Sequence, residues 1–321
     1  MYLEKNIYKK ISKNFNNYNI KKIESGASKK NFYKLYNQDK SYVITDFIKD
    51  KKEFKNHLDI YNILKDIEIS IPRIIEYNTN ENILISEDFG DLRFDKILNT
   101  HSIKNLLNIA VDTLIIIKNS INYDIQNNMQ KYSYKIFKDE IMELPSYYFP
   151  HINIRDKNLF SDFLSIWTLA YKNLNFEFNS FIHKDFNINN LIFLPNKKNH
   201  LKCGVIDFQN AFWGDSTWDL FSLLEDSRIL FTDEFNNYLI KYFYQKTNKD
   251  ITFLNFKKNF YFFNCSRQTR LLGRWVKLSK EINNDYYLKF IPNTLIRLKK
   301  GLKLLDDKNL NFFYNRYIFN K

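Results

Sequence analysis

The chain has 321 residues, of which 44% are hydrophobic and 17% aromatic. This much apolar material excludes an intrinsically disordered chain and suffices for a sizeable core, in two domains or in one domain of two lobes. The formal net charge of +13 accompanies an excess of Lys and Asn over Gly, Pro and Arg, which is the bias of an AT-rich coding sequence, so the charge calls for no nucleic-acid partner and we expect none.

Two cysteines, Cys203 and Cys265, lie far apart in the sequence and belong to no cluster with metal-ligand spacing. This usage is typical of a reducing compartment. Residues 1–19 are polar and charged and lack the apolar stretch of a signal peptide. No segment approaches the roughly 20 apolar residues that a membrane-spanning helix needs. We therefore expect a cytoplasmic protein without a membrane partner.

The N-terminal part predicts mostly strands and one helix. Residues 31–36 and 41–48 are rich in aromatic and β-branched side chains and are joined by a short polar connection, as in a hairpin. Apolar side chains follow near helical spacing over 51–66. Two further strand-like runs occupy 73–77 and 82–86. This order predicts a small antiparallel sheet braced by one helix.

After Gly90 the apolar periodicity becomes helical. Residues 102–119 predict a helix with Ser102 as its N-cap, and 157–173 predict another. Short apolar runs return at 181–182, 191–194 and 203–208. From Trp218 to the end the pattern is helical again. We therefore expect an α+β fold whose lobes are residues 1–90 and 91–321.

The densest group of chemically useful residues lies between these apolar runs. His183, Asp185 and Asn190 have the spacing His-x-Asp-x-x-x-x-Asn, and Asp207 follows at the end of the next strand. Phosphoryl transfer needs an Asp that takes the proton of the acceptor hydroxyl, and an amide and a carboxylate that hold Mg²⁺ against nucleotide phosphates. The pattern predicts Asp185 as the catalytic base and Asn190 and Asp207 as Mg²⁺ ligands. The alternative is a polar loop with N-capping residues.

Residues 183–191 and 205–208 resemble the aminoglycoside phosphotransferase and choline kinase superfamily. The continuation over 207–220 is similar to one branch, the anomeric sugar kinases that phosphorylate N-acetylmuramate and N-acetylglucosamine in peptidoglycan recycling. Asn210 stands where that branch has an acid. Further similarity lies in three more segments, so the resemblance spans nearly the whole chain. These segments are 26–28 with 32–34, then 132–134, and 267–278.

The resemblance implies a bilobal, protein-kinase-like fold. A small N-terminal antiparallel sheet lobe with one helix (1–90) would bind the nucleotide, and a larger, mainly helical lobe (91–321) would carry catalysis and the acceptor. It also implies that His183 packs as a scaffold and that Asp219 braces the catalytic loop.

The implied function is that of an ATP- and Mg²⁺-dependent small-molecule kinase acting on a sugar hydroxyl, the anomeric hydroxyl of N-acetylmuramate or N-acetylglucosamine. Two alternatives stay open. One is a kinase of the same superfamily for an aminoglycoside, choline or homoserine-type acceptor. The other is a non-catalytic, kinase-like nucleotide-binding protein.

Two segments are candidates for nucleotide binding. The loop of Gly26, Ala27 and Ser28 can cover phosphates with backbone N–H groups and a hydroxyl, the alternative being an ordinary turn. The segment of Glu87, Asp88 and Phe89 would be the hinge whose backbone reads the adenine edge.

The strand at 41–46 has no Lys where protein kinases carry the phosphate-binding one. Lys29, Lys34 and Lys49 are candidate replacements, and the sequence does not choose among them. Glu53 faces the right way for an ion-pair partner, the alternative being a solvated acid on a helix face.

Acceptor binding is assigned to four polar residues. Gln209 and Asn210 lie beside the expected metal site. Arg267 and Arg270 share a helix face with Arg274, and a planar guanidinium suits a carboxylate such as that of muramate. The alternative for this face is a solvated or salt-bridged helix surface.

Overall fold

The computed structural model describes residues 7, 10–24, 30–48, 50–174, 176, 178–229, 232–247 and 251–319. The chain divides into two compact units, the first built from Met1–Ser120 and Ile188–Ala211 and the second from Ile121–Asn187 and Phe212–Lys321. The boundary expected at residue 90 falls inside the first unit. The reason is that α3 (Ile103–Ser120) packs against two later segments, the short helix η6 (Asn199–Lys202) and the strand β8 (Cys203–Val205).

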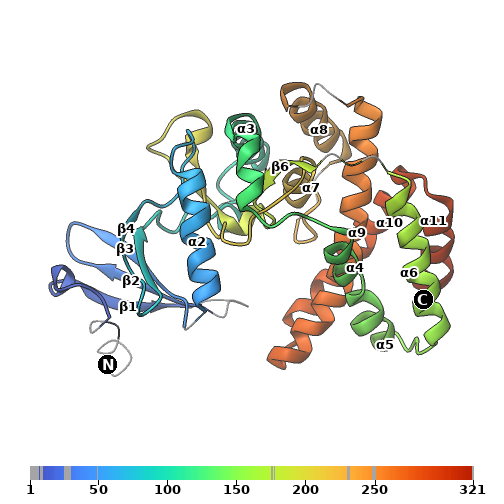
Figure 1. Cartoon of the computed structure of the whole chain (residues 1–321), viewed down its shortest axis with the longest axis horizontal. Helices are drawn as coiled ribbons and strands as arrows, with labels where there is room; N and C mark the ends of the chain where they lie inside the picture. The colour runs from blue at the N-terminus through green and yellow to red at the C-terminus, as the bar shows by residue number, and fades with distance from the viewer. Residues whose placement is uncertain are drawn as a thin grey trace. The chain divides into compact units, whose positions relative to one another are not determined.

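An antiparallel five-stranded sheet forms the N-terminal part of the first unit, in the order β1-β2-β3-β5-β4 (Figure 1). Its strands are β1 (Asn19–Ile23), β2 (Asn31–Tyr36), β3 (Ser41–Asp46), β4 (Ile74–Asn78) and β5 (Ile83–Glu87). The four predicted strands are confirmed. Strand β1 was not predicted, because Ile20 is its one buried residue and the strand carries no alternation of apolar side chains.

Helix α2 (Lys51–Leu64) braces this sheet, as predicted (Figure 1). It begins after Asp50, whose side chain accepts a hydrogen bond from the Glu53 N–H at 2.9 Å. An N-cap of this kind satisfies one of the N–H groups that a helix start leaves without a partner. Phe54 on the buried face of α2 packs edge-on against Phe47, with ring centroids 5.4 Å apart. The helix therefore begins at a fixed point and is held to the sheet by aromatic contacts.

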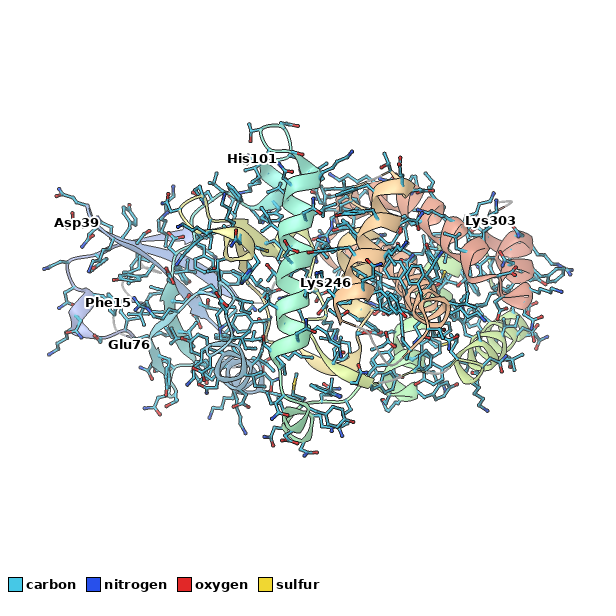
Figure 2. All side chains as sticks on the ribbon, turned by 90° about the horizontal axis from the view of Figure 1, so that it is seen from above. Phe15, Asp39, Glu76, His101, Lys246 and Lys303 are labelled. Carbon is cyan, nitrogen blue, oxygen red and sulfur yellow. The ribbon has the colours of Figure 1, made fainter. Side chains whose placement is uncertain are left out.

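The segment before β1 packs against this sheet. Phe15 packs edge-on against Tyr18 and Tyr42, with ring centroids 5.6 and 6.0 Å apart. The side chain of Glu76, on β4, accepts a hydrogen bond from the Ser12 N–H at 3.2 Å. Phe15 and Glu76 are both labelled in Figure 2. Because Tyr42 lies on β3 and Glu76 on the edge strand β4, this segment reaches across the sheet.

A short hairpin completes the first unit. It is formed by β7 (Leu191–Phe193) and β8 (Cys203–Val205), which pair antiparallel. The Val205 N–H donates to the Ser70 carbonyl at 2.8 Å, and the Ser70 hydroxyl donates to the Leu201 carbonyl at 2.7 Å. These bonds tie the hairpin to the connection between α2 and β4, and so fix the backbone from which Asp207 follows.

The second unit is mainly helical, with α9 at its centre (Figure 1). Its helices are α4 (Tyr134–Ile141), α5 (Phe149–His151), α6 (Lys157–Lys172), α7 (Trp218–Leu224), α8 (Asp233–Thr247), α9 (Phe253–Ile282), α10 (Ile291–Leu305) and α11 (Lys308–Tyr314). Strands β6 (Phe178–Ile182) and β9 (Phe212–Asp215) pair antiparallel. The predicted α+β class and the predicted helices are confirmed. Within the described ranges, no helix is both long and apolar enough to cross a membrane.

Short turns of helix link these elements. They are η1 (Lys13–Phe15), η2 (Phe94–Lys96), η3 (Tyr123–Asn128), η4 (Leu144–Tyr148), η5 (Ile188–Asn190), η6 (Asn199–Lys202), η7 (Asp285–Phe290) and η8 (Asn315–Phe319).

Gly273, in the middle of α9, lies where the helix touches another backbone. A Cβ atom added there would be 2.1 Å from the Glu143 carbonyl oxygen and 2.8 Å from the Leu144 nitrogen. We expect Gly273→Ala to lower the free energy of unfolding by roughly 1–3 kcal/mol, the usual cost of overpacking, as measured by urea denaturation. Gly301→Ala is the comparison, because there the nearest atoms belong to the side chains of Cys265 and Asn264. A larger loss of unfolding free energy in Gly301→Ala than in Gly273→Ala would contradict the interpretation that backbone contact makes Gly273 the more sensitive position.

Candidate active site

Asp207 follows β8 and adopts a backbone φ of +65°. Residues other than Gly seldom adopt this region, and those that do are concentrated at functional sites. Its Oδ1 atom accepts hydrogen bonds from Lys30 Nζ at 3.1 Å and from Gln209 Nε2 at 2.9 Å. The Asp207 side chain is 39% exposed. The predicted metal ligand is therefore a fixed carboxylate that solvent can reach.

Lys30, directly before β2, is the cation of this cluster. Its side chain is 7% exposed, and Nζ lies 3.2 Å from Glu53 Oε1 in addition to its contact with Asp207. Gln209 Nε2 also donates to Glu53 Oε1, at 3.2 Å. A buried ammonium needs such partners, because removing it from water is costly. Glu53 is therefore an ion-pair partner, as one of the two sequence interpretations has it.

Lys30 was not among the lysines that the sequence offered for phosphate binding. Of those three candidate lysines, Lys34 pairs with Asp88 at 3.0 Å, whereas Lys29 and Lys49 lie outside the described residues. Lys30 directly precedes the strand, and the residues around it form no pattern that predicts a buried side chain there. Its burial depends on Glu53 and Asp207, which are distant in sequence, so no local signal identified it.

His57 lies one helical turn after Glu53 on α2. Its ring packs against the Phe208 ring with centroids 4.7 Å apart, and edge-on against Phe47 at 5.6 Å. Burial lowers the pKa of His57 to about 4, and the positive charge of Lys30 acts in the same direction. The neutral imidazole thus packs against Phe208, the residue that follows Asp207.

This depressed pKa predicts a pH dependence of stability. Because the unfolded chain takes up the His57 proton near pH 6.5 and the folded chain only near pH 4, the stabilisation is complete above pH 6.5 and is lost as the pH falls through this window. In metal-free buffer, His57→Phe should remove about 1–3 kcal/mol of the difference in unfolding free energy between pH 7 and pH 4. Urea denaturation at both pH values measures it. An unchanged difference in the variant would show that His57 does not titrate in this way.

Asn190 lies in η5 and precedes β7. Its carbonyl oxygen accepts a hydrogen bond from the Ile206 N–H at 3.1 Å, so Asn190 and Asp207 flank the same hairpin. An amide and a carboxylate offer the hard oxygen ligands that Mg²⁺ prefers, and Mg²⁺ is commonly held by one or two protein ligands plus substrate phosphates and water. The donor set therefore fits Mg²⁺. Within the described part of the chain, no group of three or more His, Cys, Asp or Glu side chains could hold a metal ion.

The expected hinge is a rigid segment at the end of β5. The Glu87 N–H donates to the Arg73 carbonyl at 2.9 Å, and Asp88 Oδ1 accepts from the Gly90 N–H at 2.8 Å. Phe89 packs against Gly204, where a Cβ atom would come within 2.6 Å of its ring. Adenine binding by residues 87–89 stays a prediction. The expected phosphate loop of Gly26, Ala27 and Ser28 lies outside the described residues.

In the second unit, the loop after β6 carries Asp185. The backbone N–H groups of His183 and Lys184 donate to the two carboxylate oxygens of Asp219, at 2.7 and 3.0 Å. Asp219 is 4% exposed at the start of α7. Burial raises its pKa to about 7, whereas the two N–H bonds favour its ionised form. The implied brace of the loop by Asp219 is confirmed, and His183 is buried as expected.

The Asp185 side chain is 34% exposed. Its Oδ1 atom lies 3.8 Å from Arg267 Nη2, and its backbone carbonyl accepts a hydrogen bond from Asn187 Nδ2 at 3.0 Å. A solvent-reachable carboxylate on a braced loop can accept a proton from a hydroxyl group.

The four acceptor candidates have different surroundings. Gln209 is buried within the Lys30 cluster, whereas Asn210 is exposed in the turn that follows. Arg270 pairs with Glu140 at 2.6 Å, as the salt-bridged interpretation expects for this helix face. Arg267 is 9% exposed and bonds within the second unit. Acceptor contacts by these residues stay predictions.

Known proteins match this chain in sequence. Residues 150–249 match the model of the phosphotransferase enzyme family, and this segment contains Asp185, Asn190 and Asp207. The N-acetylmuramate/N-acetylglucosamine kinase of Pseudomonas aeruginosa is 22% identical over 206 residues, which is 63% of this chain and 58% of that protein. Proteins of the same name from Caulobacter vibrioides and Neisseria meningitidis are 27% and 28% identical over 43% and 37% of this chain, and over 38% and 36% of their own length.

Solved structures match the fold over most of the chain. The choline kinase LicA from Streptococcus pneumoniae matches with a TM-score of 0.61 and 17% identity, over 95% of this chain and 99% of that one. The ADP-bound aminoglycoside phosphotransferase APH(2'')-Ib matches with a TM-score of 0.59 and 16% identity, over 94% and 98%. The chain therefore has the protein-kinase-like fold of these structures, and its residues 150–249 are similar to the phosphotransferase enzyme family.

Proposed function

We propose that this protein is an ATP- and Mg²⁺-dependent small-molecule kinase that transfers the γ-phosphoryl group to a sugar hydroxyl. The observation that carries this proposal is the Asp185 loop. Within the segment that matches the phosphotransferase family, two buried N–H bonds to Asp219 hold the loop while the Asp185 carboxylate stays accessible.

Asp185 is the proposed general base. Its carboxylate orients the acceptor hydroxyl and takes its proton as the oxygen attacks the γ-phosphorus, and ADP leaves on the opposite side. Asn190 and Asp207 would hold Mg²⁺ through their side-chain oxygens. When bound, the ion neutralises charge on the nucleotide phosphates. The protein's share of catalysis is thus positioning and electrostatics.

We assign the phosphate-binding cation to Lys30. Its burial and its bonds to Glu53 and Asp207 hold the ammonium in one place. A fixed cation costs no reorganisation when phosphate charge develops. Lys30 would thereby supply the function for which the sequence offered Lys29, Lys34 or Lys49.

N-acetylmuramate and N-acetylglucosamine are the proposed acceptors, phosphorylated at the anomeric hydroxyl in the cytoplasm. Support comes from the names of the three curated relatives. The chain spans about 58% or less of the lengths of these relatives. The identity of the acceptor is therefore a proposal for this chain. Asn210, exposed beside Asp207 in sequence, is the first residue we would assign to the acceptor.

An ADP-release assay with a panel of acceptors tests this function. With ATP and Mg²⁺, we expect turnover on the two amino sugars to exceed turnover on kanamycin, choline and homoserine by at least about tenfold, as expected when a site is built for specific hydroxyl contacts. Highest turnover on one of the other three would replace the acceptor. ATP binding without turnover on any acceptor would favour a non-catalytic nucleotide-binding protein.

A further inference from the structure

Lys184, the residue directly before Asp185, has a backbone φ of +81°. A side chain such as Lys adopts this left-handed region at a cost of about 1–3 kcal/mol. Such a conformation persists only where surrounding groups hold it. The direction of the chain into Asp185 therefore depends on whatever holds Lys184.

Buried side chains hold both polar backbone groups of Lys184. Its N–H donates to Asp219 Oδ1 at 3.0 Å. Its carbonyl oxygen accepts from Arg267 Nη1 and from Trp218 Nε1, both at 3.2 Å. Asp219, Arg267 and Trp218 are 4%, 9% and 1% exposed. The N–H group of this strained residue is thus held by α7, and its carbonyl group is held by α7 and α9.

Arg267 is itself anchored. Its Nη1 atom donates to Ser222 Oγ on α7 at 2.8 Å, as well as to the Lys184 carbonyl. Its second nitrogen, Nη2, lies 3.8 Å from Asp185 Oδ1. One planar guanidinium therefore contacts a fixed helix, the strained backbone and the carboxylate of the proposed base. A lysine ammonium, which is a point charge, lacks this geometry.

We infer that Arg267 is a positioning residue for Asp185: it keeps Lys184 in the left-handed conformation and so directs the Asp185 carboxylate toward the acceptor hydroxyl. This inference rests on the proposed function, in which Asp185 is the base. It gives Arg267 a role different from the acceptor contact that its helix face suggested. A displacement of about 1 Å at such a group can cost about 10²-fold in rate.

Arg267→Lys separates the two roles. We expect kcat with the preferred amino sugar to fall by about 10- to 100-fold while the KM values for ATP and acceptor stay within about twofold, because the change acts in the transition state. A rise in acceptor KM at unchanged kcat would make Arg267 an acceptor contact and would overturn the inference.

Arg297→Lys is the matched control for loss of a buried guanidinium. Arg297 is 3% exposed, bonds the Leu224 carbonyl at 3.3 Å and pairs with Glu225 at 2.6 Å. We expect both variants to lose stability in urea denaturation, and kcat to fall in the Arg267 variant alone. If kcat fell equally in Arg297→Lys, the effect at Arg267 would be explained by a general loss of structure. That result would overturn the inference.

Crystal structures of the Arg267→Lys variant and of the double variant Arg267→Lys/Lys184→Gly test the same step without activity. Gly adopts positive φ without the cost that Lys has. We expect residue 184 to leave the left-handed region in the single variant and to keep it in the double variant. An unchanged loop in Arg267→Lys would overturn the inference whatever the turnover. A wild-type enzyme that turns over no acceptor, with the loop shifted in Arg267→Lys, would overturn the proposed function and leave Arg267 as a holder of this loop.

Discussion

Asp185→Ala should lower kcat for phosphoryl transfer by about 10² to 10⁴, the range typical of a lost general base. The fold should survive, because the bonds that hold the loop run from the backbone of His183 and Lys184 to Asp219 and do not use the Asp185 carboxylate. Steady-state ADP release measures the first effect and urea denaturation the second. The KM for ATP should change little, since the base acts on the acceptor.

Asp162→Ala is the control for this prediction. Asp162 is an exposed acid on α6, so its removal changes the net charge by the same amount without touching the loop. Full activity in the control and a large loss in Asp185→Ala is the predicted pair of results. If Asp185→Ala kept wild-type turnover, the assignment of the base would be wrong.

The second large effect is expected at Asp207. Asp207→Asn keeps the size of the side chain but removes the negative charge of Asp207, which is the one charged residue of the two proposed Mg²⁺ ligands and also pairs with Lys30. We expect kcat/KM for ATP to fall by on the order of 10²-fold or more, since a bound Mg²⁺ supplies several kcal/mol of charge stabilisation in the transition state. The measurement is ADP release as a function of Mg²⁺ concentration.

The dependence on Mg²⁺ separates the loss of a metal ligand from the loss of the ion-pair partner of Lys30. If Asp207 is a ligand, Asp207→Asn should need more Mg²⁺ for half-maximal activity than the wild type, and added Mg²⁺ should restore part of the rate. A variant with reduced activity and the same Mg²⁺ requirement as the wild type would indicate that Asp207 acts through Lys30 and not through the metal.

Local patterns in the sequence predicted most of the fold. The strands β2 to β5 carry their own aromatic and β-branched signal, and α2 and α3 have clear helical periodicity. Strand β1 has no such signal, because pairing with β2 and one buried side chain are what make it a strand.

The candidate site divides in the same way. Asp185, Asn190 and Asp207 could be proposed from the sequence because their residue types and short spacing match what phosphoryl transfer needs, and their roles stay predictions. The positions of Lys30 and Arg267 were not, because each depends on partners from other elements. Lys30 meets Asp207 from 177 residues away, and Arg267 meets Lys184 from 83 residues away. A local sequence pattern does not predict such long-range pairing.

The proposed kinase transfers phosphate from ATP to a sugar hydroxyl. The most direct test is a ³¹P NMR spectrum of a reaction containing ATP, Mg²⁺, N-acetylmuramate and the purified protein, with Asp185→Ala as a parallel sample. We predict a sugar-phosphate resonance that grows in step with ADP in the wild-type sample and is almost absent with Asp185→Ala. Release of ADP and inorganic phosphate without a sugar phosphate, or no change in ATP, would contradict the claim.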